Sequence, residues 1–244
     1  MTAWARRRFT VLGLLLLAVG GAARAEQRPV ALELVLAVDC SSSVSKGEFD
    51  LQMQGIAAAF RDPSVHEAIR SYAAEGLAVT LVQWSSLSNQ VGAVDWSLIT
   101  DRPSAERFAA AVARQSRAVG GGRTAIGEAV VFSLQAIEGN AFAGARKVID
   151  VSGDGLWNQG RPPAAAKALA EASDTTINGL AVLSLEPALA EHYRDMVIAG
   201  PEAFVITARR YSDFAEAILR KLLREIVGPR IASAPGDAGL LAER

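Results

Sequence analysis

The chain has 244 residues, half of them hydrophobic, which is enough to bury one sizeable core and form one or two domains. Its 25 basic and 26 acidic residues nearly balance, so nucleic acid is a poor candidate partner. A single cysteine, Cys40, excludes an intramolecular disulfide. We interpret Cys40 as a small buried residue rather than a reactive thiol or metal ligand, because neighbours at a strand end alternate between faces.

The first 25 residues have the pattern of an export signal. Three arginines at positions 6–8 precede a leucine-rich stretch over 11–20, and Ala23-Arg24-Ala25 fits a small-x-small cleavage site. The apolar stretch is too short to cross a membrane as a helix. We therefore predict that residues 1–25 are a signal peptide that is removed after export. Export would follow either the general or the twin-arginine route. The product would be periplasmic or extracellular, with no membrane span and a net charge of −5 from 21 basic and 26 acidic residues.

Oxygen-bearing side chains follow the first apolar run after the predicted signal peptide. Residues 32–38 are apolar except for Glu33, and they end in Asp39 and three serines. This pattern is typical of a buried parallel strand whose carboxyl end opens onto a ligand site. The D-x-S-x-S spacing of Asp39, Ser41 and Ser43 offers one carboxylate and two hydroxyls from one loop. Hard cations such as Mg²⁺ prefer such oxygen ligands.

Strands and helices alternate along the chain. We expect strands over residues 31–39, 76–84, 91–96, 147–152, 175–183 and 203–206. We expect helices over residues 45–61, 104–117, 124–138, 162–172, 187–197 and 211–227, with a shorter helical turn at 65–72. Ser45 and Glu48 can form a capping box for the first helix, and Ser104 can cap the helix at 104–117.

This alternation predicts an α/β fold with a doubly wound, mostly parallel sheet and helices on both faces. Only residues 85–90 separate the second and third strands, so these two should pair as a hairpin and add one antiparallel edge strand. We expect one domain over 26–228, followed by a disordered tail over 229–244.

Two further loops should reach the carboxyl edge of this sheet. Thr124 follows three glycines at the start of a predicted helix, and Asp154 follows the strand at 147–152. With Asp39, Ser41 and Ser43 they make two carboxylates and three hydroxyls. Mg²⁺ takes about six oxygens and keeps some as water. A cation held by only two carboxylates would remain attractive to a carboxylate from outside.

Together these motifs resemble the von Willebrand factor type A domain and its metal-ion-dependent adhesion site. The matching segments are DCSSS after an apolar strand, GGGRTAIGEA and VSGDG, and the resemblance covers about residues 31–227. The phrases VQWSS, SGDGLWN, INGLAV and AEAILRKLLREI further resemble a bacterial exported subgroup of undefined function, similar to DUF1194.

The resemblance implies a ligand set and a function. Ser41, Ser43 and Thr124 would bind Mg²⁺ (or Mn²⁺) through their hydroxyls, and Asp39 and Asp154 would bind it directly or through water. One coordination position would accept an Asp or Glu from a protein partner. We expect no other cofactor, and we expect the protein to be a monomer. In relatives, occupancy can be coupled to movement of the last helix, here 211–227.

One position departs from the commoner D-x-S-G-S form of the motif, because Ser42 stands where glycine is usual. If that position needs a positive φ, serine would cost on the order of 1 kcal/mol.

Two other functions compete with the adhesion-type site. A metal-dependent hydrolase would need a base, and the two histidines, His66 and His192, fall in predicted helices away from the strand ends. A G-x-S-x-G nucleophile motif is also absent from the sequence, so we do not expect an enzyme. The other alternative is a structural or envelope-assembly module with an incidental metal. Trp157 and Asn158 follow Asp154 closely, and they either rim the metal face or pack beneath the loop.

Overall fold

The computed structural model describes residues 27–228. The predicted signal peptide at 1–25 and the predicted tail at 229–244 lie outside these residues.

A single six-stranded sheet forms the centre of the described part of the protein. Its strands are β1 (Arg28–Asp39), β2 (Leu77–Trp84), β3 (Gln90–Ile99), β4 (Phe142–Gly153), β5 (Thr175–Val182) and β6 (Val205–Ala208). They lie in the order β3-β2-β1-β4-β5-β6, and only the β2–β3 pair is antiparallel. The predicted doubly wound sheet with one antiparallel edge strand is therefore confirmed.

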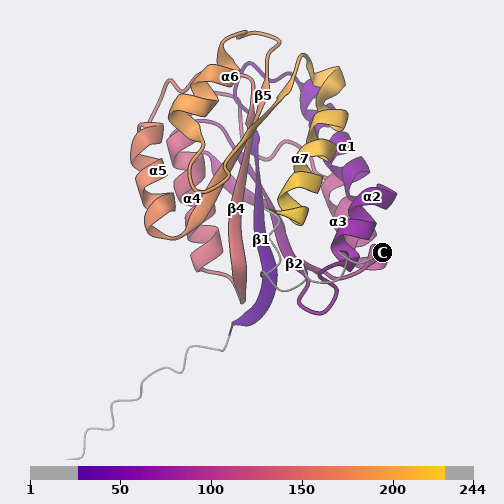
Figure 1. Cartoon of the computed structure of the whole chain (residues 1–244). Coiled ribbons are helices and arrows are strands. Elements are labelled where there is room, and N and C mark those ends of the chain that lie inside the picture. The colour runs from indigo at the N-terminus through magenta and orange to yellow at the C-terminus, as the bar shows by residue number, and fades with distance from the viewer. Residues whose placement is uncertain (1–26, 229–244) are drawn as a thin grey trace, which may run out of the picture.

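Helices cover both faces of the sheet (Figure 1). One face packs against α1 (Lys46–Ala59), α2 (Pro63–Arg70), α3 (Arg102–Ala113) and α7 (Phe214–Val227). The other face packs against α4 (Ile126–Glu138), α5 (Pro163–Ala172) and α6 (Leu189–His192). Because β1 and β4 lie between the two layers, their central residues are buried on both sides, as their apolar runs predict.

The carboxyl ends of β1 and β4 mark the point where the chain order of the sheet reverses. From β1 the chain crosses to β2 on one side, and the later strands continue from β4 on the other side. Loops that leave the two strands here turn toward opposite faces, which opens a crevice at the sheet edge. Asp39 ends β1 and Asp154 directly follows β4, so both carboxyl groups lie at this crevice.

The N-terminal cap of α1 agrees with the sequence prediction, and the cap of α3 differs from it. The predicted capping box of α1 is present, with Glu48 N donating to Ser45 Oγ at 3.3 Å and Ser45 N donating to Glu48 Oε2 at 2.8 Å. The cap of α3 is Asp101 and not Ser104, which lies at the third helical position and whose Oγ accepts a hydrogen bond from Asp101 N at 3.1 Å. Pro103 explains the shift, since proline is tolerated in the first helical turn.

The helix expected at 187–197 consists of two pieces, α6 and a π-helical turn over Tyr193–Val197. The helix expected at 211–227 begins with a short 3₁₀ turn over Tyr211–Asp213 before α7. Both irregular turns place a buried tyrosine, Tyr193 or Tyr211, below the crevice.

Candidate metal centre

The structure brings all five predicted ligands together at the crevice. Ser43 Oγ donates to Asp154 Oδ1 at 2.6 Å, and the hydroxyls of Ser41 and Ser43 lie 3.0 Å apart. Ser43, Thr124 and Asp154 line one open depression of about 440 Å³. Asp39 accepts a hydrogen bond from the backbone N–H of Ser41 at 2.6 Å, which folds the loop back over the end of β1.

The three hydroxyl groups are not used as helix caps. Ser45 caps α1, so Ser41 and Ser43 are free to pair with each other and with Asp154. Thr124 lies just before α4, which begins without a side-chain cap. Its backbone is instead fixed by Asn158, whose Oδ1 accepts from Thr124 N at 2.9 Å and whose N–H donates to Thr124 O at 3.1 Å.

The two carboxyl groups are buried without a compensating cation among the described residues. Asp39 is fully buried and Asp154 is 1% exposed. Burial, and next the charge of Asp154, raise the pKa of Asp39 to about 7. Burial also raises the pKa of Asp154, and hydrogen bonding from Ser43 partly offsets this. The Oδ2 atoms of both residues are buried, and neither has a well-aligned hydrogen-bond partner among residues 27–228, although Tyr211 beside Asp154 and the backbone N–H of Asp154 beside Asp39 lower the two pKa values in part.

This donor set fits a hard divalent cation. Two buried carboxylates are strongly stabilised in their charged form when a cation lies between them. Hydroxyl and carboxylate oxygens are the ligands that Mg²⁺ and Mn²⁺ prefer. Among residues 27–228 there is no cluster of three or more His, Cys, Asp or Glu side chains that could form a different metal site.

Arg117 holds the loop that carries Ser41 and Ser43. Its Nη2 donates to the backbone carbonyls of Cys40, Ser41 and Val44, each at 2.8 Å. The segment that carries Arg117 is fixed in turn by Gln83 at the end of β2, whose Oε1 accepts from Ala118 N at 2.7 Å. Sequence reasoning missed Arg117, because it lies more than 70 residues from the loop and belongs to no motif.

The unusual Ser42 is accommodated without backbone strain. Among the described non-glycine residues only Asp174 and Glu202 have a positive φ, so the expected cost of serine does not arise. Ser42 N donates to Gly122 O at 3.0 Å, and a Cβ on Gly121 would lie 3.0 Å from Ser42 Oγ. The glycine-rich loop therefore provides the room that the serine side chain needs.

Two buried tyrosines lie behind the carboxyl groups. A Cβ on Gly153 would lie 2.9 Å from both Asp39 Oδ2 and Tyr193 OH, so only glycine lets these groups approach the end of β4. Burial raises the pKa of Tyr193 and Tyr211 well above the ordinary value for a phenol, and the nearby Asp39 and Asp154 raise it further. Both phenols therefore stay protonated as potential donors to the site.

The position of His192 differs from the sequence expectation. Its Nε2 accepts a hydrogen bond from Trp157 N at 3.2 Å, so this histidine supports the loop after β4 instead of lying away from the strand ends. Trp157 both lines the depression and packs against the core on the α4 side, which combines the two roles considered for it. His66 Nε2 lies 2.9 Å from the carbonyl of Phe60, outside the site.

Cys40 is buried, as expected. Burial, and next the charge of Asp39, raise the pKa of its thiol to about 12, so it remains a protonated thiol at neutral pH. Its Sγ points toward Gln83 Oε1 at 3.7 Å.

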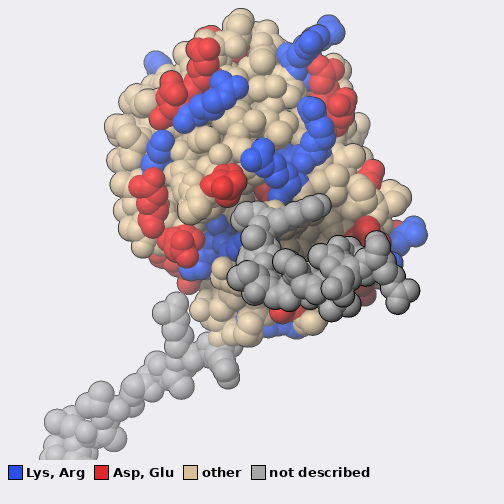
Figure 2. All heavy atoms as spheres, in the orientation of Figure 1, with Lys and Arg blue, Asp and Glu red and all other residues tan. Residues whose placement is uncertain are grey.

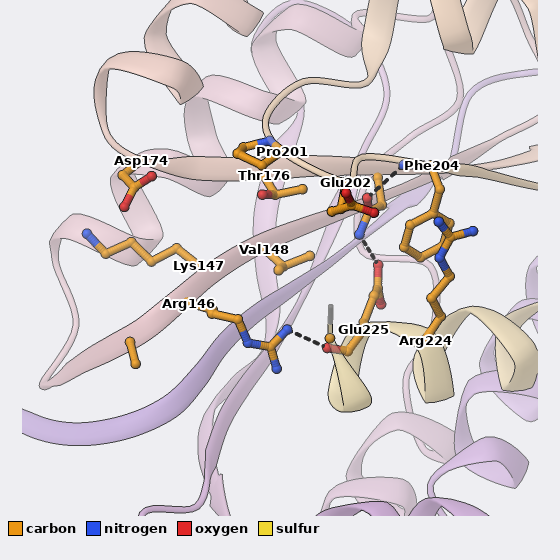
Figure 3. A pocket seen from close by; sticks show the side chains of 13 residues that line it. Arg146, Lys147, Val148, Asp174, Thr176, Pro201, Glu202, Phe204, Arg224 and Glu225 are labelled. Carbon is orange, nitrogen blue, oxygen red and sulfur yellow. Dashed lines mark hydrogen bonds between the residues drawn. The ribbon is translucent and has the colours of Figure 1, made fainter. Parts of the chain in front are cut away.

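A second cavity, of about 370 Å³, lies at the opposite end of the sheet, between β4, β5 and the end of α7 (Figure 3). Several of its polar groups are engaged with neighbouring protein groups. Arg146 donates to the carbonyls of Glu225 and Ile226 at 2.9 Å, and Asn178 Nδ2 donates to Glu225 Oε1 at 3.0 Å. Arg224 stacks on the Phe204 ring at 3.9 Å. We therefore assign no ligand to this cavity.

On the face shown in Figure 2, basic and acidic side chains are interspersed. Among the described residues, no helix has the length and apolar character that a membrane span requires.

The sheet has the strand order and the helix layers of a von Willebrand factor type A-like fold. The chain belongs to the family described as "Protein of unknown function (DUF1194)", which matches residues 29–230. No curated protein is similar enough to count as a relative.

Solved structures share the fold at low sequence identity. One is proximal thread matrix protein 1 from the mussel byssus with a zinc-occupied MIDAS motif, the metal-ion-dependent adhesion site (16% identity, TM-score 0.56, 83% of this chain and 50% of that one). Another is the pilus adhesin SpaC from Lactobacillus rhamnosus GG (13%, 0.59, 83% and 31%). A third is the von Willebrand factor type A protein from Catenulispora acidiphila (16%, 0.54, 81% and 43%). This chain thus spans half or less of each of these proteins.

Proposed function

We propose that this protein is an exported binding module that engages an acidic group of a protein partner through a divalent cation. Asp39, Ser41, Ser43, Thr124 and Asp154 would hold the cation, and the bound ion would offer one coordination position to the partner's carboxylate. The observation that carries the proposal is the pair of buried carboxyl groups, on Asp39 and Asp154, whose Oδ2 atoms lack a well-aligned hydrogen-bond donor among the described residues.

Mg²⁺ or Mn²⁺ is the expected ion. The site offers only oxygen donors, which favour hard cations over zinc, although zinc occupies the corresponding motif in the mussel protein. The chain's own residues prepare the site: Arg117 fixes the loop of Ser41 and Ser43, and Asn158 fixes Thr124.

Binding is favoured over catalysis by what surrounds the site. Histidine is the commonest general base in enzymes, and neither histidine is free at this site. His192 Nε2 accepts from Trp157 N, and His66 Nε2 lies 2.9 Å from Phe60 O, outside the site. The pilus and byssus proteins that share the fold are consistent with a role in adhesion or assembly outside the cytoplasm, and the export signal pattern at 1–25 agrees with that location.

Partner capture with and without metal tests this function. The mature chain, 26–244, is immobilised and exposed to envelope extract in Mg²⁺ or in EDTA, beside a folded Asp39→Ala variant. We expect a captured protein that is lost in EDTA and in the variant. Capture that survives both conditions would contradict a metal-bridged contact. Ester or phosphate hydrolysis that is lost in the variant would favour the hydrolase instead.

A further inference from the structure

Exposed leucines gather around the candidate metal centre. Six large apolar side chains are more than a third exposed among the described residues, and three of them lie on loops at the carboxyl edge of the sheet. These three are Leu87 (51% exposed), Leu156 (40%) and Leu185 (64%). Single exposed leucines are common on protein surfaces, so their position relative to the site decides whether they have a role.

Two of these leucines line the same depression as the candidate ligands. Beyond Ser43, Thr124 and Asp154, the wall continues through residues 155–158, which include Leu156, to Leu185 and Glu186 on the loop before α6. A group that reaches the cation position therefore has Leu156 and Leu185 close by, with Glu186 beside them on the side toward α6.

The loop that carries Leu156 is held in place by other segments. Trp157 N donates to His192 Nε2 at 3.2 Å, and Asn158 exchanges two hydrogen bonds with Thr124. Gln159 Oε1 accepts from Leu87 N at 3.1 Å. An ordered loop loses little conformational entropy when a partner binds, so contacts with its leucine contribute to affinity more fully.

Glu186 adds a charge preference to this wall. Glu186 lines the depression beside Leu185, and its Oε1 accepts a hydrogen bond from Ala188 N at 3.3 Å. A second acidic side chain beside the first would meet like charge there, whereas an apolar side chain would not.

We propose that Leu156 and Leu185 form a subsite for a large aliphatic side chain next to the carboxylate that meets the cation. The partner segment would then present one acidic residue beside a leucine-like residue, in place of a run of acidic residues. This inference rests on the proposed function, since the subsite is defined relative to a metal-bound carboxylate.

Two small carboxylates test the subsite without the natural partner. Acetate supplies the carboxylate alone, and 4-methylpentanoate adds a leucine-like branched tail. Both are titrated into the Mg²⁺-loaded mature chain and followed by amide chemical shifts in NMR spectra. We expect 4-methylpentanoate to bind about tenfold more tightly than acetate, because its tail buries apolar surface against the two leucines.

Two variants test whether Leu156 and Leu185 cause the tighter binding of 4-methylpentanoate. In the double variant Leu156→Ser/Leu185→Ser, acetate should bind as in the wild type and the tenfold gain should disappear. Leu169→Ser removes a leucine of similar exposure (45%) from α5 and should leave the gain intact. Equal affinity of the two carboxylates in the wild type, or a gain that persists in the double variant, overturns the subsite alone. Acetate binding that does not depend on Mg²⁺ overturns both the subsite and the metal-bridged function.

Discussion

Arg117 Nη2 donates a 2.8 Å hydrogen bond to the carbonyl of Ser41, a residue that offers its hydroxyl to the candidate metal centre. The same nitrogen reaches the carbonyls of Cys40 and Val44 at 2.8 Å, so one guanidinium sets the curvature of the whole loop. Groups that orient metal ligands are often as important to affinity as the ligands themselves.

We therefore expect Arg117→Met to weaken Mg²⁺ binding by about 10- to 100-fold, because the loop carbonyls lose their shared donor. Arg117→Lys, which keeps a charge and several donors, should give an intermediate affinity. Calorimetric titration with Mg²⁺ measures this order, and Arg114→Met at the end of α3 is the control. Wild-type affinity in a folded Arg117→Met protein would show that the arginine does not position the site.

Replacing Asp39 should have opposite effects on the stability of the metal-free protein and on its stabilisation by Mg²⁺. Because the folded-state pKa of Asp39 is raised to about 7, this group stabilises the metal-free fold most at low pH, and that contribution is lost as pH rises through 7. Asp39→Asn should therefore raise the melting temperature of the metal-free protein at pH 8. The same variant should lose stabilisation by Mg²⁺. A variant that is still stabilised by Mg²⁺ as the wild type is would exclude Asp39 as a ligand.

Proton competition should also appear in the affinity for the ion. As pH falls below 7, Asp39 takes up a proton that must leave before the metal binds. The apparent Mg²⁺ affinity of the wild type should fall by up to about tenfold per pH unit in this range. Titrations between pH 5.5 and 8 measure the slope, and an affinity independent of pH across that range would disagree with a carboxylate of raised pKa in the site.

Ser42 and Gly121 should be energetically coupled. A Cβ at position 121 would lie 3.0 Å from Ser42 Oγ, which is tighter than ordinary contact. Gly121→Ala should destabilise the protein by about 1 kcal/mol, and most of this loss should vanish when Ser42→Gly is also present. Urea unfolding of the two single variants and the double variant gives the coupling. Additive effects would mean that the serine does not depend on the glycine opposite it.

A buried ionic cluster links α7 to the sheet. Lys221 is fully buried, lies 2.9 Å from Asp150 Oδ1 and also pairs with Glu225. Replacing Lys221 with methionine would leave two buried carboxyl groups without their cation, so we expect a loss of about 3–5 kcal/mol in unfolding free energy. Lys46→Met breaks the exposed Lys46–Asp50 pair and should cost less than about 1 kcal/mol. Similar losses in the two variants would contradict the importance of burial.

The same cluster predicts a pH effect on stability. Burial raises the pKa of Asp150 to about 7, against the opposing influence of Lys221. The contribution of this group should be present at pH 4 and decline as pH rises toward 7. Asp150→Asn should flatten that part of the stability profile in urea unfolding at a series of pH values. An unchanged profile would assign the pH dependence to other groups.

The pattern of the chain predicts the fold well and leads to a set of candidate ligands at one edge of the sheet, because both depend on local signals. Apolar runs mark the strands; Asp39 directly follows one such run, and Asp154 lies just after the end of β4. The supporting groups could not be predicted in this way. Arg117, Tyr193 and His192 act across long stretches of chain, and their roles arise only when separate elements pack together.

The correct cap of α3 has a local signal in the sequence. Asp101 precedes Arg102-Pro103, and a proline at the second helical position places the cap at Asp101, two residues before it. The cost of serine at position 42 depends on whether φ is positive there, and φ is a property of the folded loop that the sequence alone does not fix. Here the hydrogen bond from Ser42 N to Gly122 O fixes the loop without a positive φ.

The central claim is that one divalent cation binds between Asp39 and Asp154. Crystals of the mature chain grown with Mn²⁺, measured at a wavelength where manganese scatters anomalously, test it most directly. We predict a single strong anomalous peak in contact with the hydroxyls of Ser41, Ser43 and Thr124 and beside the two carboxylates. No peak at this position at saturating Mn²⁺, or a peak only elsewhere on the molecule, would contradict the account.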